Sequence, residues 1–127
     1  MRRRGEAAAL LMVLLSGGTA AAQNTPAGDP VVGQEIFKKC QTCHSAEIGV
    51  NKIGPSLWNV IGRQSATVPD YPYSKTMQNT NKTWDAAALD VFLADPRHVL
   101  SGTRMMFQGL PDPKDRADVI AFLTTLQ

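Results

Sequence analysis

The run Cys-Gln-Thr-Cys-His at residues 40–44 limits what this chain can fold into more than any other feature. It has the C-x-x-C-H form by which two thiols are joined to a haem. Residues three apart on a helix lie on one face, so Cys40 and Cys43 can reach a single flat molecule. His44 then follows, placed to offer a ring nitrogen to the iron. Since these are the only cysteines in the chain, we predict one covalently bound haem.

Three other interpretations of this motif explain less. A structural zinc site needs four Cys or His ligands, and only His98 remains to complete the set. A thioredoxin-like pair would follow a strand in a βαβ pattern, which is not evident near the motif. A plain disulfide between Cys40 and Cys43 would leave His44 without a role.

The first 22 residues resemble a secretory signal peptide. Arginines at positions 2–4 precede a short apolar run at 7–15, and three alanines at 20–22 form a cleavage site. An uncleaved membrane anchor is the alternative, but this run is shorter than the ~20 residues that span a bilayer. We therefore predict a periplasmic protein with a flexible lead at 23–28 and one domain at 29–127.

The formal charge of +2 comes entirely from the predicted signal peptide. Beyond residue 22 the chain has ten Lys and Arg and ten Asp and Glu, so it is neutral before any haem propionate is counted. Proteins that bind nucleic acid usually have a basic domain. We expect no nucleic-acid partner, and a small core that depends on the haem for folding.

Turn and capping signals predict three main helices. Asp29-Pro30 and Asp112-Pro113 are typical helix starts, and the last helix is expected to reach about Leu126. Between them, Thr83 is expected to cap a helix over 84–94 that ends before Pro96. The first helix is expected to carry the C-x-x-C-H motif at its end. No alternating strand pattern is evident, and residues 46–73 and 100–111 are interpreted as long loops, which predicts an all-α fold.

With these elements assigned, the chain resembles a class I cytochrome c over nearly the whole mature length. The landmarks occur in the family's order: Gly33…Phe37, C-x-x-C-H at 40–44, Gly54-Pro55-Ser56-Leu57, Gly62-Arg63, Tyr73-Ser74, Trp84, Gly102-Thr103-Arg104-Met105 and Phe122. The resemblance implies three main helices, short helical turns and long loops wrapped around one haem. It also implies that the terminal helices cross at Gly33, Phe37 and Phe122.

The resemblance further implies that His44 and Met105 ligate the iron. From composition alone, the mature chain also offers Met77, Met106 and His98 as sixth ligands. Pro55 is expected to accept a hydrogen bond from His44, although it could be an ordinary turn proline. Side chains expected near the haem propionates are Arg63, Tyr73, Trp84 and Thr103, which could otherwise be a solvated arginine, two packed aromatics and a capping threonine. Phe107 matches the aromatic residue that covers the haem edge.

Four positions depart from the family pattern. Phe92 stands where many relatives have Tyr, so a hydroxyl that could bond the methionine sulfur is missing. Ser101 stands where Pro is common, Arg104 replaces a Lys, and Met77 stands where some relatives have Asn. These changes concern the reduction potential and the methionine loop more than the fold.

The expected function is that of a soluble, monomeric, single-haem electron carrier and not an enzyme. Partner proteins are expected to dock at a basic patch around the haem edge, made of Lys38, Lys39, Lys52, Arg97 and Arg104. The alternatives are a haem enzyme or gas sensor with a displaceable sixth ligand, and a dedicated electron-transfer subunit of one dehydrogenase.

Overall fold

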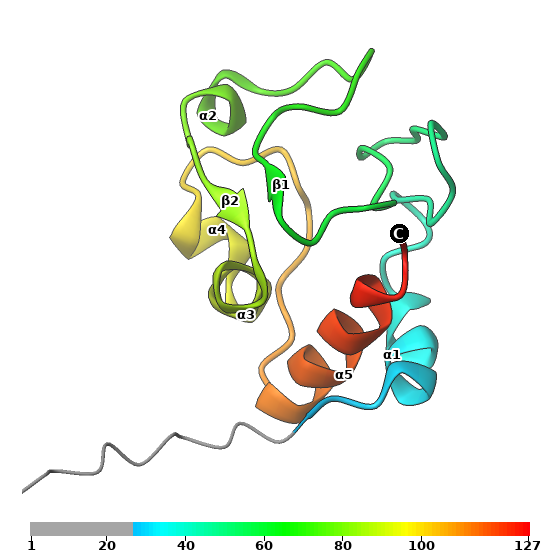
Figure 1. Cartoon of the computed structure of the whole chain (residues 1–127). Helices are drawn as coiled ribbons and strands as arrows, with labels where there is room; N and C mark the ends of the chain where they lie inside the picture. The colour runs from blue at the N-terminus through cyan, green and yellow to red at the C-terminus, as the bar shows by residue number, and fades with distance from the viewer. Residues whose placement is uncertain (1–26) are drawn as a thin grey trace, which may run out of the picture.

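The computed structural model describes residues 27–127, so the predicted signal peptide (1–22) and residues 23–26 of the predicted lead lie outside it. Five helices and two short strands follow one another along this part of the chain (Figure 1). Their order is α1 Pro30–Phe37, β1 Arg63–Gln64, α2 Lys75–Gln78, β2 Thr83–Trp84, α3 Ala86–Ala94, α4 Pro96–Val99 and α5 Pro113–Thr124. The predominantly helical prediction is confirmed, and the strands add one short antiparallel ladder.

Helix α1 begins where its sequence predicts. The Asp29 carboxylate accepts hydrogen bonds from the backbone N–H groups of Val31 at 2.8 Å and Val32 at 3.3 Å, and Pro30 takes the first helical position. The helix ends at Phe37, and the C-x-x-C-H motif lies in the turns that follow it. The prediction that α1 itself carries the motif was therefore wrong by one turn.

The start of α3 corrects a second prediction. Thr83 does not cap this helix, because it belongs to β2 and its hydroxyl donates to Gln64 Oε1 at 2.9 Å. The N-cap is Asp85, whose carboxylate accepts from the backbone N–H of Ala88 at 2.7 Å. Trp84, expected inside the helix, instead pairs with Arg63 in the ladder. This pairing places Trp84 directly opposite Arg63.

The first and last helices pack closely against each other (Figure 1). A Cβ built on Gly33 would overlap the carbonyl of Asp118 and lie 2.9 Å from Cβ of Phe122, so only glycine allows this approach. The Phe37 and Phe122 rings meet with centroids 5.1 Å apart. The predicted crossing of the terminal helices at these residues is confirmed.

A buried carboxylate fastens the start of α1 to α5. Asp118 is only 1% exposed and accepts from the backbone N–H of Asp29 at 2.8 Å and from the Lys114 ammonium at 2.7 Å. The Lys114 hydrogen bond, followed by that of Asp29, holds the pKa of Asp118 below its usual value. Helix α5 ends at Thr124, two residues before the expected Leu126, although Leu126 remains in the core.

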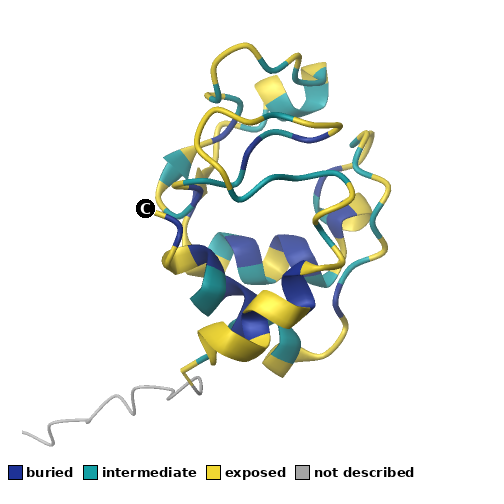
Figure 2. Ribbon diagram, turned by 90° about the vertical axis from the view of Figure 1, so that its right-hand side faces the viewer, coloured by how far each residue is buried: buried dark blue, intermediate teal, exposed yellow. Residues whose placement is uncertain are grey.

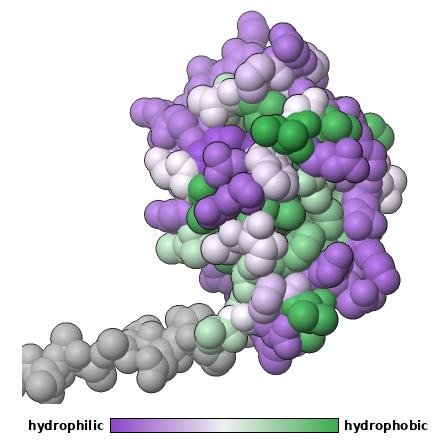
Figure 3. Space-filling model, turned by 45° about the vertical axis from the view of Figure 1, so that its right-hand side comes forward, coloured by the Kyte–Doolittle hydropathy of each residue, from purple (hydrophilic) through white to green (hydrophobic). Residues whose placement is uncertain are grey.

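Most of the fully buried residues lie where helices face one another, whereas the loops are mostly half-buried or exposed (Figure 2). The segment 100–111 contains no helix or strand, as the sequence predicts, whereas the loop predicted at 46–73 is interrupted by β1 at Arg63–Gln64, because these residues pair with β2. Apolar patches lie among hydrophilic side chains on the surface (Figure 3). The large exposed apolar residues include Ile48, Ile53 and Met106. Within residues 27–127, none of the helices has the length and apolar character needed to cross a membrane.

Candidate cofactor site

A cavity of about 470 Å³ lies between the helices and the long loops. Every residue predicted to bind or surround a haem lines this one cavity. These residues are Cys40, Cys43, His44, Pro55, Arg63, Tyr73, Trp84, Thr103, Met105 and Phe107. Segments far apart in the sequence therefore converge on a single site.

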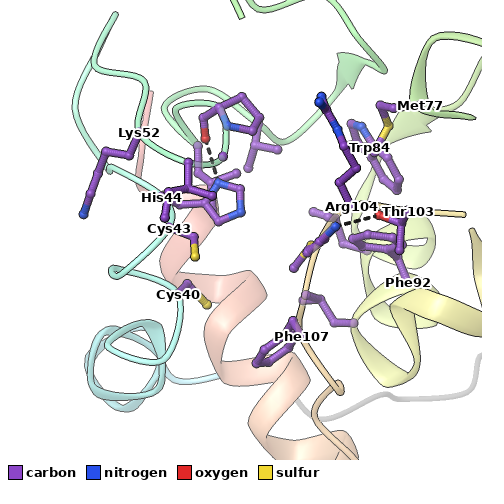
Figure 4. A pocket seen from close by; sticks show the side chains of 18 of the residues that line it. Cys40, Cys43, His44, Lys52, Met77, Trp84, Phe92, Thr103, Arg104 and Phe107 are labelled. Carbon is purple, nitrogen blue, oxygen red and sulfur yellow. Dashed lines mark hydrogen bonds between the residues drawn. The ribbon is translucent and has the colours of Figure 1, made fainter. Parts of the chain in front are cut away.

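One wall of the cavity carries the C-x-x-C-H motif (Figure 4). Consecutive turns produce it: the backbone N–H of Cys43 donates to Cys40 O at 3.1 Å, and that of His44 donates to the same oxygen at 2.9 Å. Both thiols are free and half-buried, and burial raises the pKa of Cys40 to about 11. The two sulfurs and the imidazole are thus presented from adjacent turns.

Hydrogen bonding determines which nitrogen His44 can offer. Its Nδ1 lies 2.7 Å from the carbonyl oxygen of Pro55, an acceptor, so Nδ1 carries the hydrogen and Nε2 keeps its lone pair. Burial lowers the pKa of His44, and the nearby charges of Arg63 and Lys52 lower it further, against the opposing effect of the Pro55 bond. The ring is therefore neutral and suited to a metal.

The loop that carries Met105 lines the opposite side of the cavity, and Figure 4 shows Thr103, Arg104 and Phe107 across from His44. The backbone N–H of Met105 donates to Thr103 Oγ1 at 3.2 Å. The Met105 side chain is half-buried against the core, whereas Met106 is 82% exposed. Met77 also lines the cavity and packs against the core, while His98 is exposed on α4.

A third group of side chains closes the end of the cavity near the strand ladder. Arg63 donates through Nη1 to the carbonyl oxygens of Ser56 at 2.9 Å and Trp58 at 3.0 Å, and burial lowers the pKa of its guanidinium. The Tyr73 hydroxyl accepts from the backbone N–H of Val68 at 3.2 Å, and burial raises its pKa. Trp84 packs on Phe92 with ring centroids 5.1 Å apart. These side chains combine N–H and O–H groups with an apolar wall.

Sequence reasoning missed the role of Gly54. A Cβ at this position would lie 2.7 Å from Nδ1 and 2.8 Å from Nε2 of His44, too close to the imidazole ring for any real contact. Glycine is therefore required for the ring to lie flat against the backbone. The sequence showed Gly54 only as part of the family landmark Gly54-Pro55-Ser56-Leu57, with no indication of its contact with His44.

The five residues of the predicted basic patch fall into two groups according to whether they line the cavity. Lys39, Lys52 and Arg104 line the cavity, whereas Lys38 and Arg97 do not. Lys38 pairs with Glu35 at 2.6 Å, and the Lys52 ammonium donates to the carbonyl of Gln41. Among the described residues, none of those that line the cavity is acidic.

The residues present fit a large, flat, mostly apolar cofactor with a metal at its centre. Two thiols from one turn can form covalent attachments, a neutral imidazole has a free nitrogen, and most of the remaining lining is aliphatic or aromatic. A soft thioether on the facing wall suits a haem iron.

Comparison with known proteins supports the same conclusion. A sequence model of the cytochrome c family matches residues 31–127. The chain belongs to the cytochrome c family. It is 48% identical over 103 residues to cytochrome c2 of Rhodomicrobium vannielii, covering 78% of this chain and 80% of that protein. It is 41% identical to cytochrome c2 of Rhodopila globiformis, covering 82% and 99% of the two chains.

A solved structure shares the fold. Cytochrome cH from Methylobacterium extorquens superimposes with a TM-score of 0.73 at 37% identity, covering 77% of this chain and 99% of that one. This chain is thus a class I cytochrome c with one covalent haem c, and Cys40 and Cys43 stand at the attachment position. It is an electron carrier that exchanges electrons with redox partner proteins.

Proposed function

We propose that this cytochrome c carries a haem attached to Cys40 and Cys43, with iron ligated by His44 and Met105, and diffuses as a monomer in a bacterial periplasm. The axial assignment is supported by the positions of the two proposed ligands, which come from opposite sides of the cavity. His44 offers a free Nε2 from one side, and the loop containing Met105 faces it. Met105 is favoured over Met106 because its side chain packs against the core.

The surrounding residues supply hydrogen-bond donors for the haem propionates. Burying the haem propionates is costly unless hydrogen-bond donors meet them. Arg63, Tyr73, Trp84 and Thr103 supply N–H and O–H groups along the cavity, and the aromatic ring of Phe107 adds to its apolar lining. The Pro55 carbonyl keeps the proton on Nδ1 of His44, so Nε2 remains available to the iron.

Electron transfer needs little movement of these groups. The bound haem supplies a one-electron Fe(III)/Fe(II) couple. With His44 and Met105 holding the iron, a substrate would find no open site at the metal. A thioether raises the potential relative to nitrogen ligation, so the pair suits a carrier of relatively high potential.

Partner proteins would approach at the basic patch. Lys39, Lys52 and Arg104 line the cavity, and Lys38 and Arg97 are exposed beyond it. An excess of positive charge at this site attracts an acidic partner and raises the association rate, even though the mature chain is neutral overall. Rates of electron transfer should therefore fall as salt increases.

Spectroscopy of protein matured in a host with haem-attachment machinery tests the proposal. We expect a low-spin haem with a far-red band from methionine sulfur in the oxidised protein and slow binding of carbon monoxide to the reduced protein. Met105→Leu should abolish the band, whereas Met77→Leu and Met106→Leu should retain it. A band that survives Met105→Leu would refute the axial assignment, and rapid carbon monoxide binding by the native protein would favour the gas-sensor alternative.

A further inference from the structure

The loop that carries Met105 is well fastened at its two ends. Near the start, the backbone N–H of Thr103 donates to Leu100 O at 3.0 Å. At the end, the Leu110 N–H donates to Leu93 O at 2.7 Å, and Arg116 donates to the Leu110 carbonyl at 2.8 Å. The intervening stretch, residues 104–109, packs against its neighbours at Gly109 and Phe107 but makes few hydrogen bonds.

Within residues 27–127, one hydrogen bond joins the stretch 104–109 to a distant segment. The Arg104 guanidinium donates to the carbonyl oxygen of Pro72, 32 positions away in the sequence. The other hydrogen bond of this stretch is the local one from Met105 N–H to Thr103 Oγ1. Arg104 directly precedes Met105, so this contact acts next to the thioether.

Pro72 is itself held to the wall that carries His44. Its neighbour Tyr71 donates its hydroxyl to the carbonyl of Ile53 at 2.6 Å, and the Tyr71 and Tyr73 rings meet edge to face with centroids 4.7 Å apart. Ile53 precedes Gly54, the residue in contact with the His44 ring. The hydrogen bonds Arg104–Pro72 and Tyr71–Ile53 therefore link the loop that carries Met105 to the segment that contacts His44. We name these two hydrogen bonds the mouth bridge.

We propose that Arg104 is a positioning residue that, through the mouth bridge, holds the Met105 loop at its working distance from His44. This inference rests on Met105 being the sixth ligand. It gives Arg104 a role different from that of a free docking cation. Arginine suits this role because its guanidinium is charged at every physiological pH and presents several donors in a fixed plane.

Arg97 provides a matched control. It is exposed like Arg104, lies seven positions earlier, and among the described residues its side chain makes no hydrogen bond or ion pair. Arg104→Gln and Arg97→Gln remove the same charge, so a difference between them reports the hydrogen bond. The probe is carbon monoxide added to the reduced haem protein, because it binds only when Met105 leaves the iron.

We expect Arg104→Gln to bind carbon monoxide at least ten times faster than the parent protein, and Arg97→Gln to stay within twofold. Hydrogen exchange at the backbone amides of residues 104–109 should accelerate in Arg104→Gln alone. Equal rates for the two variants would overturn the proposal. If the parent protein lacks the far-red methionine band, the axial assignment has failed instead, and the two failures are thereby distinguished.

Tyr71→Phe tests the second link without changing any charge. It removes the hydroxyl that bonds Ile53, so the mouth bridge predicts faster carbon monoxide binding here as well. Because the two links act in series, the double variant should be no faster than the faster single variant. Effects that multiply would indicate two independent contacts and would refute the bridge.

Discussion

Gly54 lies so close to His44 that a Cβ at this position would overlap the imidazole ring, 2.8 Å from Nε2. Gly54→Ala should therefore displace the ring and weaken its bond to iron while leaving both thiols free to attach haem. We expect a partly high-spin optical and magnetic spectrum. Gly49→Ala is the control for an added methyl group that meets open space; it should stay low-spin even though its φ of 72° adds a backbone strain that Gly54→Ala lacks. A fully low-spin Gly54→Ala protein would contradict this account.

Phe92→Tyr should raise the reduction potential by tens of millivolts. Phe92 is 6% exposed and lines the cavity near the Met105 loop, so an added hydroxyl can donate to the thioether sulfur. Such a bond withdraws electron density from the ligand and favours the reduced iron. For scale, 59 mV is a tenfold change in a one-electron equilibrium.

Redox titration measures this shift. Phe122→Tyr adds the same hydroxyl at the crossing of α1 and α5, outside the cavity lining, and should leave the potential unchanged. The hydrogen-bond argument is lost if Phe92→Tyr moves the potential by no more than the titration error.

Asp118 should make the fold sensitive to acid. Its pKa is depressed below the ordinary 3.8, chiefly by the Lys114 hydrogen bond, so the folded state favours the charged form. The stabilisation is complete above pH 3.8 and is lost as the pH falls through the lower folded pKa. Asp118→Asn should lower the Tm at neutral pH, and the difference from the parent should shrink in acid.

Thermal melts across this range check the prediction. Asp115→Asn lies on the same helix, and its carboxylate has no hydrogen bond among the described residues, so it should show a smaller effect. A Tm difference for Asp118→Asn that stays constant down to low pH would show that its charge is not responsible.

Lys38 and Lys39 should contribute unequally to steering. Lys38 is already paired with Glu35, whereas Lys39 lines the cavity. With hexacyanoferrate(II) as an anionic electron donor at low ionic strength, we expect Lys39→Gln to slow the bimolecular reaction roughly twofold and Lys38→Gln to slow it less. The difference should disappear as salt rises. Stopped-flow rates measure this, and a larger effect of Lys38→Gln would contradict it.

Local signals predicted the elements that depend on neighbouring residues. The Asp-Pro pairs at 29–30 and 112–113 mark real helix starts, because an aspartate cap and a first-turn proline act within one turn. Thr83 misled because Ser, Thr and Asp are all good caps, and pairing with Gln64 left Asp85 as the cap. Gln64 and Thr83 are 19 positions apart, so no short sequence pattern predicts their pairing.

For the candidate site, the sequence likewise predicted residues but not the contacts between distant loops. The motif at 40–44 and the order of the family landmarks identified ten residues that all line the cavity, although many of the other lining residues were not predicted. The overlap of Gly54 with the His44 ring, and the bond from Arg104 to Pro72, depend on how distant loops meet. A single sequence does not encode such distances in any short pattern.

The contact of α1 with α5 bears on how the protein matures. Among the helices and strands of residues 27–127, α1 packs on α5 alone, so this part of the domain cannot close until α5 has been made. Cys40 and Cys43 directly follow that first helix. The order of the chain thus gives attachment enzymes an interval in which both thiols are still accessible.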